Sequence, residues 1–162
     1  MNTDGSSMSC MEWVGCEGII RDEHGSWVAG YTRHIGSTNN FVVKLWGLRD
    51  GLMLCCNMNI SSLIVELDAK MVVDVLKNSN HVNYIISPIL DDCKRLASRF
   101  HQIQFSHCYR QANRCADMLA RIGADQEAKF ILFSSLLVDW FKALEDDCNE
   151  VYFNRLYIDF SV

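Results

Sequence analysis

The chain has 162 residues, of which 49% are hydrophobic and 22% are charged, and its formal net charge is −5 at pH 7. This composition supplies enough apolar residues for one domain plus a short extension, and it argues against disorder. No run of 18 apolar residues predicts a membrane span. The polar residues after Met1 do not resemble a signal peptide, so we expect an intracellular protein, in the nucleus or the cytoplasm.

The cysteines predict neither disulfides nor a zinc site. No two of them form a C-x-x-C pair, and zinc needs closely spaced ligands. In a reducing compartment such thiols pack as small hydrophobic groups, and we expect them to be free and buried. They are Cys10, Cys16, Cys55, Cys56, Cys93, Cys108, Cys115 and Cys148.

Charge is distributed unevenly along the chain. The stretch from Lys94 to Arg121 holds six lysines or arginines and a single acid, Asp117, whereas residues 139–150 hold five acids and one lysine. The negative net charge argues against a protein that nucleic acid holds by bulk electrostatics. A polyanion would therefore approach the 94–121 stretch.

The first half of the chain predicts a β-hairpin, a helix and a further strand. Residues 12–21 and 27–35 are strand-like and are joined by a short polar loop; Gly15 and Gly18 indicate either a bulge or the close approach of another group. Capping residues at 37–40 precede a helix that ends near residues 57–59. The apolar strand 63–67 follows through that helix, which implies a parallel pairing and a right-handed crossover.

The second half predicts three helices and one strand. Residues 71–76 form the first of these helices, and Ser87 caps the next, with Pro88 in its first turn. A strand at 102–109 and a helix at 112–122, ended by Gly123, complete the pattern. The elements together predict an α/β domain with a mixed sheet flanked by helices.

Three aspartates stand where carboxylates are costly. Asp68 closes an apolar strand and Asp117 lies inside an apolar helical pattern, while Asp4 precedes small residues near the start of the chain. Read alone, Asp4 is a turn residue. Buried carboxylates are costly unless they are paired or bound to metal, so a shared divalent metal would explain all three.

Five motifs in this order resemble the type 1 ribonuclease H family, and most closely the ribonuclease H-like domains of plant retroelement-derived proteins. They are Asn2-Thr3-Asp4-Gly5-Ser6, GCEGIIRD at 15–22, LWGLRDGL at 45–52, VELDA at 65–69 and RQANRCADMLA at 110–120. The resemblance covers about residues 1–124 and implies a ribonuclease H-like fold with a mixed five-stranded sheet. Residues 125–162 would form a C-terminal tail.

The resemblance also implies a function and a site. Members of the family cut the RNA strand of an RNA–DNA hybrid with two magnesium ions, which activate water and stabilise the leaving oxygen. Carried over to this chain, Asp4, Asp68 and Asp117 would be the catalytic, metal-binding carboxylates. Nucleic-acid contacts would come from Asn40 before the first helix and from Arg110 and Asn113 before the last one; as alternatives, these are a helix cap and surface residues at a helix start.

One position departs from the family pattern. The fourth carboxylate belongs in the first helix before Trp46, and Lys44 stands there. A like charge about 4 Å from a metal costs roughly 4 kcal/mol at an effective dielectric near 20, so cleavage is in doubt. Glu66, two residues before Asp68, is the one acid that could substitute; alternatively, Lys44 pairs with the remaining acids and leaves an inert site.

Three functions therefore stay open at this stage. The chain is an RNA–DNA hybrid endonuclease, an inactive nucleic-acid-binding or relic module, or a structural protein that binds a partner through its tail. Residues 133–145 favour an amphipathic helix whose aromatic face would pack on the domain or on a protein partner. His107 could shuttle protons, although a structural role is the simpler interpretation.

Overall fold

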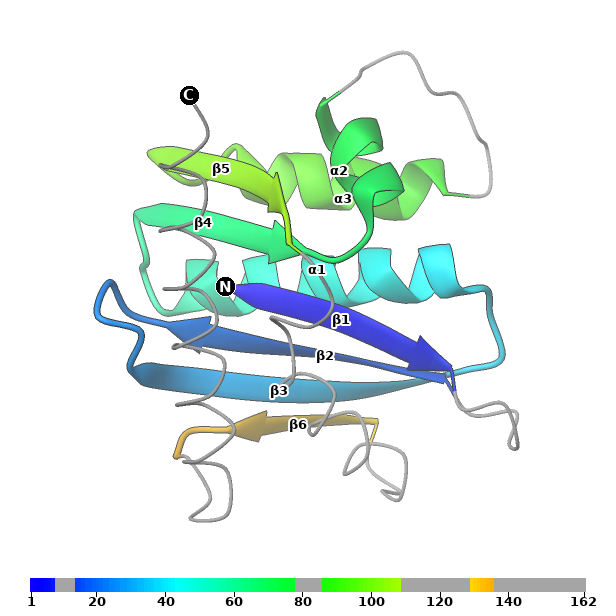
Figure 1. Ribbon diagram of the computed structural model, residues 1–162, viewed down its shortest axis with the longest axis horizontal. Helices are drawn as coiled ribbons and strands as arrows, with labels where there is room; N and C mark the ends of the chain where they lie inside the picture. The colour runs from blue at the N-terminus through cyan, green and yellow to red at the C-terminus, as the bar shows by residue number, and fades with distance from the viewer. Residues whose placement is uncertain (8–13, 78–85, 109–128, 136–162) are drawn as a thin grey trace, which may run out of the picture.

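The computed structural model describes residues 1–7, 14–77, 86–108 and 129–135, with only the backbone described for residues 4–7. The described strands and helices follow one another along the chain as Figure 1 shows. They are β1 (Asn2–Ser7), β2 (Val14–Arg21), β3 (Trp27–Gly36), α1 (Asn40–Asn57), β4 (Ser62–Leu67), α2 (Lys70–Lys77), α3 (Ser87–Ala97), β5 (Gln102–His107) and β6 (Phe130–Phe133).

The strands form one mixed sheet in the order β5-β4-β1-β2-β3-β6. The hairpin β2–β3 and the pair β1–β2 are antiparallel, whereas β4 runs parallel to both β1 and β5. Consequently β1 and β4 both end at the side of the molecule where α1 begins (Figure 1). The predicted α/β class, mixed sheet and parallel fourth strand are confirmed.

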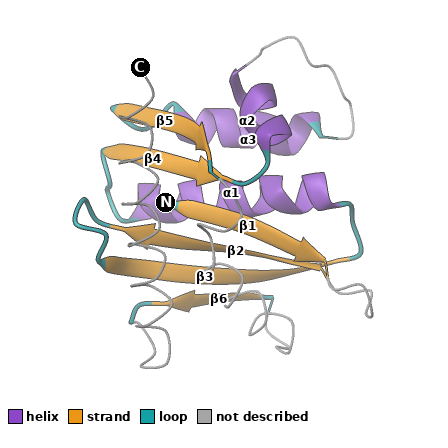
Figure 2. Cartoon of the chain, viewed as in Figure 1, coloured by secondary structure: helices purple, strands orange, loops and turns teal. Residues whose placement is uncertain are grey.

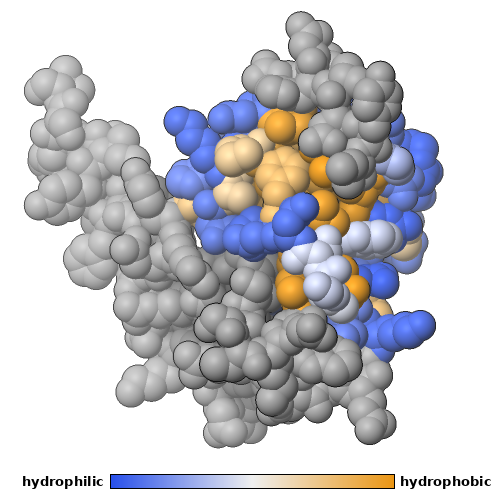
Figure 3. Space-filling view, turned by 90° about the vertical axis from the view of Figure 1, so that its right-hand side faces the viewer, coloured by the Kyte–Doolittle hydropathy of each residue, from blue (hydrophilic) through white to orange (hydrophobic). Residues whose placement is uncertain are grey.

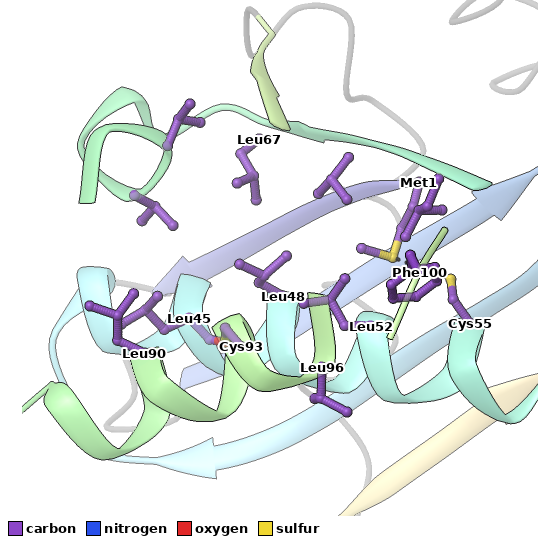
Figure 4. Packing of buried hydrophobic residues seen from close by; sticks show 14 of the residues in the cluster. Met1, Leu45, Leu48, Leu52, Cys55, Leu67, Leu90, Cys93, Leu96 and Phe100 are labelled. Carbon is purple, nitrogen blue, oxygen red and sulfur yellow. Dashed lines mark hydrogen bonds between the residues drawn. The ribbon is translucent and has the colours of Figure 1, made fainter. Parts of the chain in front are cut away.

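The helices α1, α2 and α3 lie on one side of the sheet (Figure 2). Helix α1 packs on β1 and β2 and is itself covered by α3, so it is buried on more than one side. Its leucines meet strand residues and α3 in a single core, which Figure 4 shows from close by. The labelled core residues include Leu45, Leu48, Leu52, Leu67, Leu90 and Leu96.

Local capping fixes both ends of α1. The Asn39 side chain accepts a hydrogen bond from the backbone N–H of Val42 at 2.9 Å, as an N-cap does. At the other end Asn59 adopts a positive φ of 56°, and the N–H of Ile60 donates to the carbonyl of Cys55 at 3.1 Å. The helix start and end that the sequence predicts are therefore confirmed, and they set which residues of α1 meet the sheet.

The glycine at position 18 makes room for a buried tyrosine. Tyr31 is fully buried, stands opposite Gly18 in the β2–β3 register, and donates its hydroxyl hydrogen bond to the Gly47 carbonyl at 2.5 Å. A Cβ at Gly18 would lie 2.3 Å from the tyrosine oxygen. The sequence predicted either a bulge or the close approach of another group at these glycines. Close approach is found at Gly18, whereas Gly15 lies next to a shift in the β2–β3 register.

Two details of the sequence prediction were wrong. Within the described ranges the sheet has six strands rather than five, because residues 130–133 of the predicted tail pair antiparallel with β3. Phe130 is stacked on Tyr31 with 6.1 Å between the ring centroids. Ser87 does not cap α3: its N-cap position is Ile86, which makes no side-chain cap hydrogen bond. Pro88 does occupy the first turn, where its missing N–H costs nothing.

Other sequence predictions are covered only in part. Among the described cysteines, Cys16, Cys55 and Cys93 are free thiols and buried as predicted, while Cys56 and Cys108 are half-buried. Burial raises the pKa of Cys55 to about 11 and that of Cys93 to about 12, so both stay protonated. Cys10, Cys115, Cys148, the helix at 112–122, the domain end at 124 and residues 136–145 of the predicted tail helix lie outside the described residues. Phe133, which was predicted on the apolar face of that helix, is instead the last residue of β6. Within the described ranges, no helix has the length and apolar character needed to cross a membrane.

Candidate active-site region

The pairing of β1 with β4 brings positions 4 and 68 together. Thr3 is the register partner of Leu67 in the parallel pair, so Asp68, which follows the last residue of β4, lies beside Asp4 of β1. The start of α1 lies at this end of the sheet (Figure 1). Figure 3 shows the molecule from this end, where an apolar area of the surface is bordered by hydrophilic residues. The backbones of two of the three predicted carboxylate residues, Asp4 and Asp68, therefore lie side by side.

Lys44 occupies this edge from the helix side. Its ammonium forms an ion pair and hydrogen bond with Oδ1 of Asp68, and each of the two side chains is only 10% exposed. The neighbours of Lys44 explain its position: Val43 packs against Val14 and Cys16, and Leu45 enters the main core. Helix α1 is thus held against the sheet on both sides of Lys44, and the lysine side chain is directed to the strand ends.

Glu66 has a different partner. Its Oε2 accepts a hydrogen bond from the Asn2 side-chain amide at 3.1 Å, across the register pair of β1 and β4. Asn2 is buried, so this hydrogen bond satisfies a polar group that would be costly to leave alone. The arrangement gives Glu66 a role in joining the two strands.

A second acid near Asp4 was missed in the sequence analysis. Glu17 of β2 is the register partner of Asp4 and is completely buried. The available signal was a charged residue between Gly15 and Gly18 in a strand that is otherwise apolar as far as Ile20. The pairing of β1 with β2 could be expected from the sequence. Their register could not, because the number of residues that connect the two strands was not known.

Asp50 forms a separate cluster further along α1. Its side chain is 3% exposed and accepts hydrogen bonds from Arg33 of β3 and from Arg49. Both guanidinium groups lie over the ring of Trp46, with 5.5 Å from its centroid to Arg33 and 5.2 Å to Arg49. Arg49 also donates to Asp92 of α3 at 2.9 Å, which raises the arginine pKa. Asp50 is thus bound by arginines and not by Lys44.

The predicted nucleic-acid contacts are described only at the start of α1. Asn39 and Asn40 are both exposed there; Asn39 is the cap, and Asn40 is the first residue of the helix. Arg110, Asn113 and Asp117 lie outside the described residues. His107 ends β5 as the register partner of Leu67 and is exposed.

The described side chains do not fit a two-magnesium site. Magnesium is held by carboxylate oxygens in a near-octahedral shell, but an oxygen of Asp68 is already bound by the Lys44 ammonium. In the described part of the chain, no group of three or more His, Cys, Asp or Glu side chains is arranged to hold a metal ion. The cation at this edge is instead a side chain of the protein itself.

The strand order and the position of α1 define a ribonuclease H-like α/β domain, and solved structures agree. The chain superposes on ribonuclease H1 of Halobacterium salinarum with a TM-score of 0.70 at 20% identity, covering 76% of this chain and 95% of that one. The N-terminal ribonuclease H domain of a Mycobacterium tuberculosis protein gives 0.69 at 25% identity, covering 76% and 90%. A ribonuclease H1 solved in complex with an RNA/DNA hybrid gives 0.69 at 21% identity, covering 76% and 94%.

The sequence itself identifies the family. The model of the reverse transcriptase-like family matches residues 2–123, and the chain belongs to that family. An Arabidopsis thaliana protein named as a candidate ribonuclease H is 29% identical over 120 residues, which are 74% of this chain. The match spans only 19% of that relative's length.

Proposed function

We propose that this chain is a nucleic-acid-binding module that recognises RNA–DNA hybrid and whose own cleavage is blocked by Lys44. The single observation that carries the proposal is the ion pair between Lys44 and Asp68, at the point where β4 ends beside β1. A ribonuclease of this type needs metal ions at its carboxylates. Here one of those carboxylates is neutralised by an internal ammonium.

Electrostatics explains why this pair opposes metal binding. At about 4 Å and an effective dielectric near 20, two like unit charges repel by about 4 kcal/mol, which corresponds to roughly three powers of ten in affinity. A divalent ion beside Lys44 would meet this repulsion and would also have to displace the ammonium from Asp68. The rival proposal of an active site rebuilt with Glu66 has less support, because Asn2 already binds that carboxylate.

The start of α1 supports the binding half of the proposal. Asn39 and Asn40 are exposed there, and the first turn of the helix contains no acidic residue. Helix N-termini attract phosphate through their unpaired N–H groups and the positive end of the helix dipole. With a net charge of −5, contacts to the hybrid have to be local, and Arg110, Asn113 and Arg114 are the further residues that we expect to contribute.

Cleavage of the RNA strand tests the blocked site. With magnesium, the wild-type chain should cut hybrid slowly or not at all, and Lys44→Glu should cut it faster by orders of magnitude. Lys44→Gln is the matched control: it removes the positive charge without supplying a ligand, so it should gain far less. Equal cleavage by the wild type and Lys44→Glu would contradict the proposal, and a Glu66→Gln variant that loses such activity would identify Glu66 as the substitute ligand.

Hybrid binding in the presence of a chelator tests the second half. We expect binding without metal, with an affinity that falls linearly on a logarithmic scale as salt is added. Asn40→Ala and the double variant Arg110→Ala/Arg114→Ala should weaken it, whereas Lys77→Ala, an exposed lysine at the end of α2, serves as the control. Unchanged hybrid affinity in both test variants would mean that the binding surface lies elsewhere, and it would refute this assignment.

A further inference from the structure

The end of α3 and the turn that follows it carry a cluster of basic side chains. Lys94 and Arg95 lie in the last turn of the helix, and Arg99 and His101 lie between the helix and β5. Arg99 and His101 are exposed, the Arg95 side chain is 66% exposed, and Lys94 is half-buried. The sequence has no aspartate or glutamate in residues 93–108. These four residues are called the α3-end cluster below.

The helix does not need these side chains to satisfy its last carbonyl groups. Basic residues near a helix C-terminus often serve by donating to those carbonyls. Here the carbonyls of residues 94, 96 and 97 accept backbone N–H groups at 3.0–3.2 Å, and the carbonyl of Arg95 accepts the Ser98 hydroxyl at 2.8 Å. The basic side chains of the α3-end cluster are therefore available for another role.

The acids of α3 offset the cluster only in part. Asp92 accepts a hydrogen bond from Arg95 at 2.8 Å, but it also accepts one from Arg49 of α1 at 2.9 Å, so two arginines share it. Its neighbour Asp91 lies before the cluster, whereas the turn after the helix contains no acid. In a chain whose net charge is −5, the end of α3 is thus a place where cations are concentrated. Such a local concentration attracts anions despite the net charge.

The backbone that carries the cluster is anchored on both sides of Arg99. Leu96 and Phe100 are buried in the main core, and the N–H of His101 donates to the carbonyl of Ser61, just before β4, at 2.8 Å. The exposed side chains therefore project from a turn that is fixed to the domain. A fixed turn lowers the cost of ordering that binding would otherwise have to meet.

The chemistry of this surface fits a phosphate backbone better than a protein partner. Arginine, lysine and side-chain amides are the groups that contact phosphate in nucleic-acid complexes, and the amide of Gln102 is exposed directly after His101. Protein interfaces have an apolar centre. The large apolar residues of this turn, Leu96 and Phe100, are instead buried.

The α3-end cluster lies away from the candidate active-site region. Helix α3 leads into the start of β5, and β5 runs parallel to β4, so the cluster is at the end of the sheet opposite to Asp68 (Figure 1). A strand of six residues separates the two ends by about 20 Å. We propose that the α3-end cluster is a second nucleic-acid contact, which binds the phosphate backbone of a duplex whatever its sugars are. It goes beyond hybrid recognition, because duplex DNA should bind there too.

Fluorescence anisotropy of the full chain with a short labelled DNA duplex tests this contact. The wild type should bind, with an affinity that falls as salt is added. Lys94→Gln/Arg99→Gln removes two phosphate contacts, so the slope of log affinity against log salt should decrease by about two, and the affinity at low salt should fall at least about tenfold. The Tm of this variant should stay near that of the wild type, because the helix end keeps its carbonyl partners.

Three further variants serve as controls. Lys70→Gln/Lys77→Gln removes the same charge from exposed positions of α2 and should leave the slope unchanged. Arg99→Lys keeps the charge and should retain DNA binding. Asn40→Ala, which is expected to weaken hybrid binding, should leave binding to duplex DNA as it is, so the two proposals can fail independently.

A wild-type chain that does not bind duplex DNA would overturn the proposal, even if it binds hybrid and the proposed function stands. Equal slopes for the wild type and Lys94→Gln/Arg99→Gln would overturn it as well. Polyglutamate is the competitor that represents an acidic protein. If it displaced the DNA more effectively than inorganic polyphosphate of equal charge, the cluster would belong to a protein partner, and this too would count against a nucleic-acid contact.

Discussion

Helix α1 carries two buried charges, Lys44 and Asp50, and they differ in how their partners balance them. Asp50 is one acid bound by two arginines, and both guanidinium groups lie over the Trp46 ring. Lys44 is one ammonium at the end of strands that supply several acids, with Asp68 as its observed partner. The Asp50 cluster therefore links β3 and α3 to the helix. Near Lys44, by contrast, strand register places the backbone positions of Asp4 and Glu17 next to that of Asp68, so acidic residues outnumber the lysine.

Replacing an acid by its neutral amide should therefore affect stability differently in the Asp50 cluster and in the Lys44 cluster. At Asp50 the acid is the minority charge, and its loss leaves two arginines near each other. At the Lys44 edge acids are in the majority, and the loss of one relieves repulsion. Functional sites commonly retain such unfavourable charge at a cost in stability.

The largest expected effect is at Asp50. Asp50→Asn should lower the free energy of unfolding by about 3 kcal/mol, at the lower end for a broken buried pair because the Arg33 and Arg49 side chains keep 29% and 21% of their exposure. Urea unfolding measures the loss. Glu17→Gln is the counterpart and should change stability by less than about 1 kcal/mol; equal losses in the two variants would remove the distinction between the clusters.

Gly18→Ala tests whether the two clusters share a support. The new Cβ would lie 2.3 Å from the hydroxyl oxygen of Tyr31, whose hydrogen bond to Gly47 holds α1 between Lys44 and Asp50. Moving this buried ring should cost about 1–3 kcal/mol of unfolding free energy. Gly15→Ala on the same strand approaches only the Arg33 carbonyl, at 3.1 Å, and should cost less; the reverse order in denaturant melts would show that Tyr31 is not the support.

Asn39→Ala should act on the Lys44 cluster more than on the Asp50 cluster. Loss of the N-cap hydrogen bond to Val42 costs about 1 kcal/mol and frays the first turn, which precedes Lys44. Hydrogen exchange should accelerate at residues 42–44 and stay slow around Asp50. Asn39→Asp keeps the capping oxygen and should retain protection; uniform acceleration along α1 would argue that the helix responds as one unit.

The smallest expected effect is the pH dependence of Asp92, at the α3 end of the Asp50 cluster. Hydrogen bonds from Arg95 and then from Arg49 lower the pKa of its carboxyl group. The contribution of Asp92 to stability is therefore present above its unfolded pKa, near 3.9, and is lost as the pH falls through the lower folded value. Unfolding of Asp92→Asn should be less sensitive to acid in this range, and an identical acid dependence to the wild type would exclude Asp92 as a contributor.

The sequence predicted most of the framework, because each element has its own local signal. Asp22 and Gly25 marked the hairpin, Asn39 marked the start of α1, and the apolar run before Asp68 marked β4. The sixth strand had no such signal: Phe130–Phe133 is short, and its place follows from stacking on Tyr31 and pairing with β3. Ser87 shows the limit of local rules, because a capping residue type does not ensure a capping hydrogen bond.

The candidate site was predictable to the extent that it depends on single positions. Lys44 and Asp68 could be singled out from their motifs, but the ion pair between them depends on how α1 packs against β4. Glu17 could not be found by position alone, because its relation to Asp4 depends on the β1–β2 register. Carboxylates that meet through tertiary packing need the fold before they can be grouped.

Magnesium binding to the wild-type chain and to Lys44→Glu is the most direct test of the central claim that an internal ammonium stands in place of the metal. Titration calorimetry, with Tm recorded at increasing magnesium, measures it without nucleic acid, since a bound ion stabilises the folded state in proportion to its affinity. The account predicts no binding heat and no magnesium-dependent Tm for the wild type, and predicts both for Lys44→Glu. Magnesium binding by the wild type with the same affinity as Lys44→Glu would contradict it.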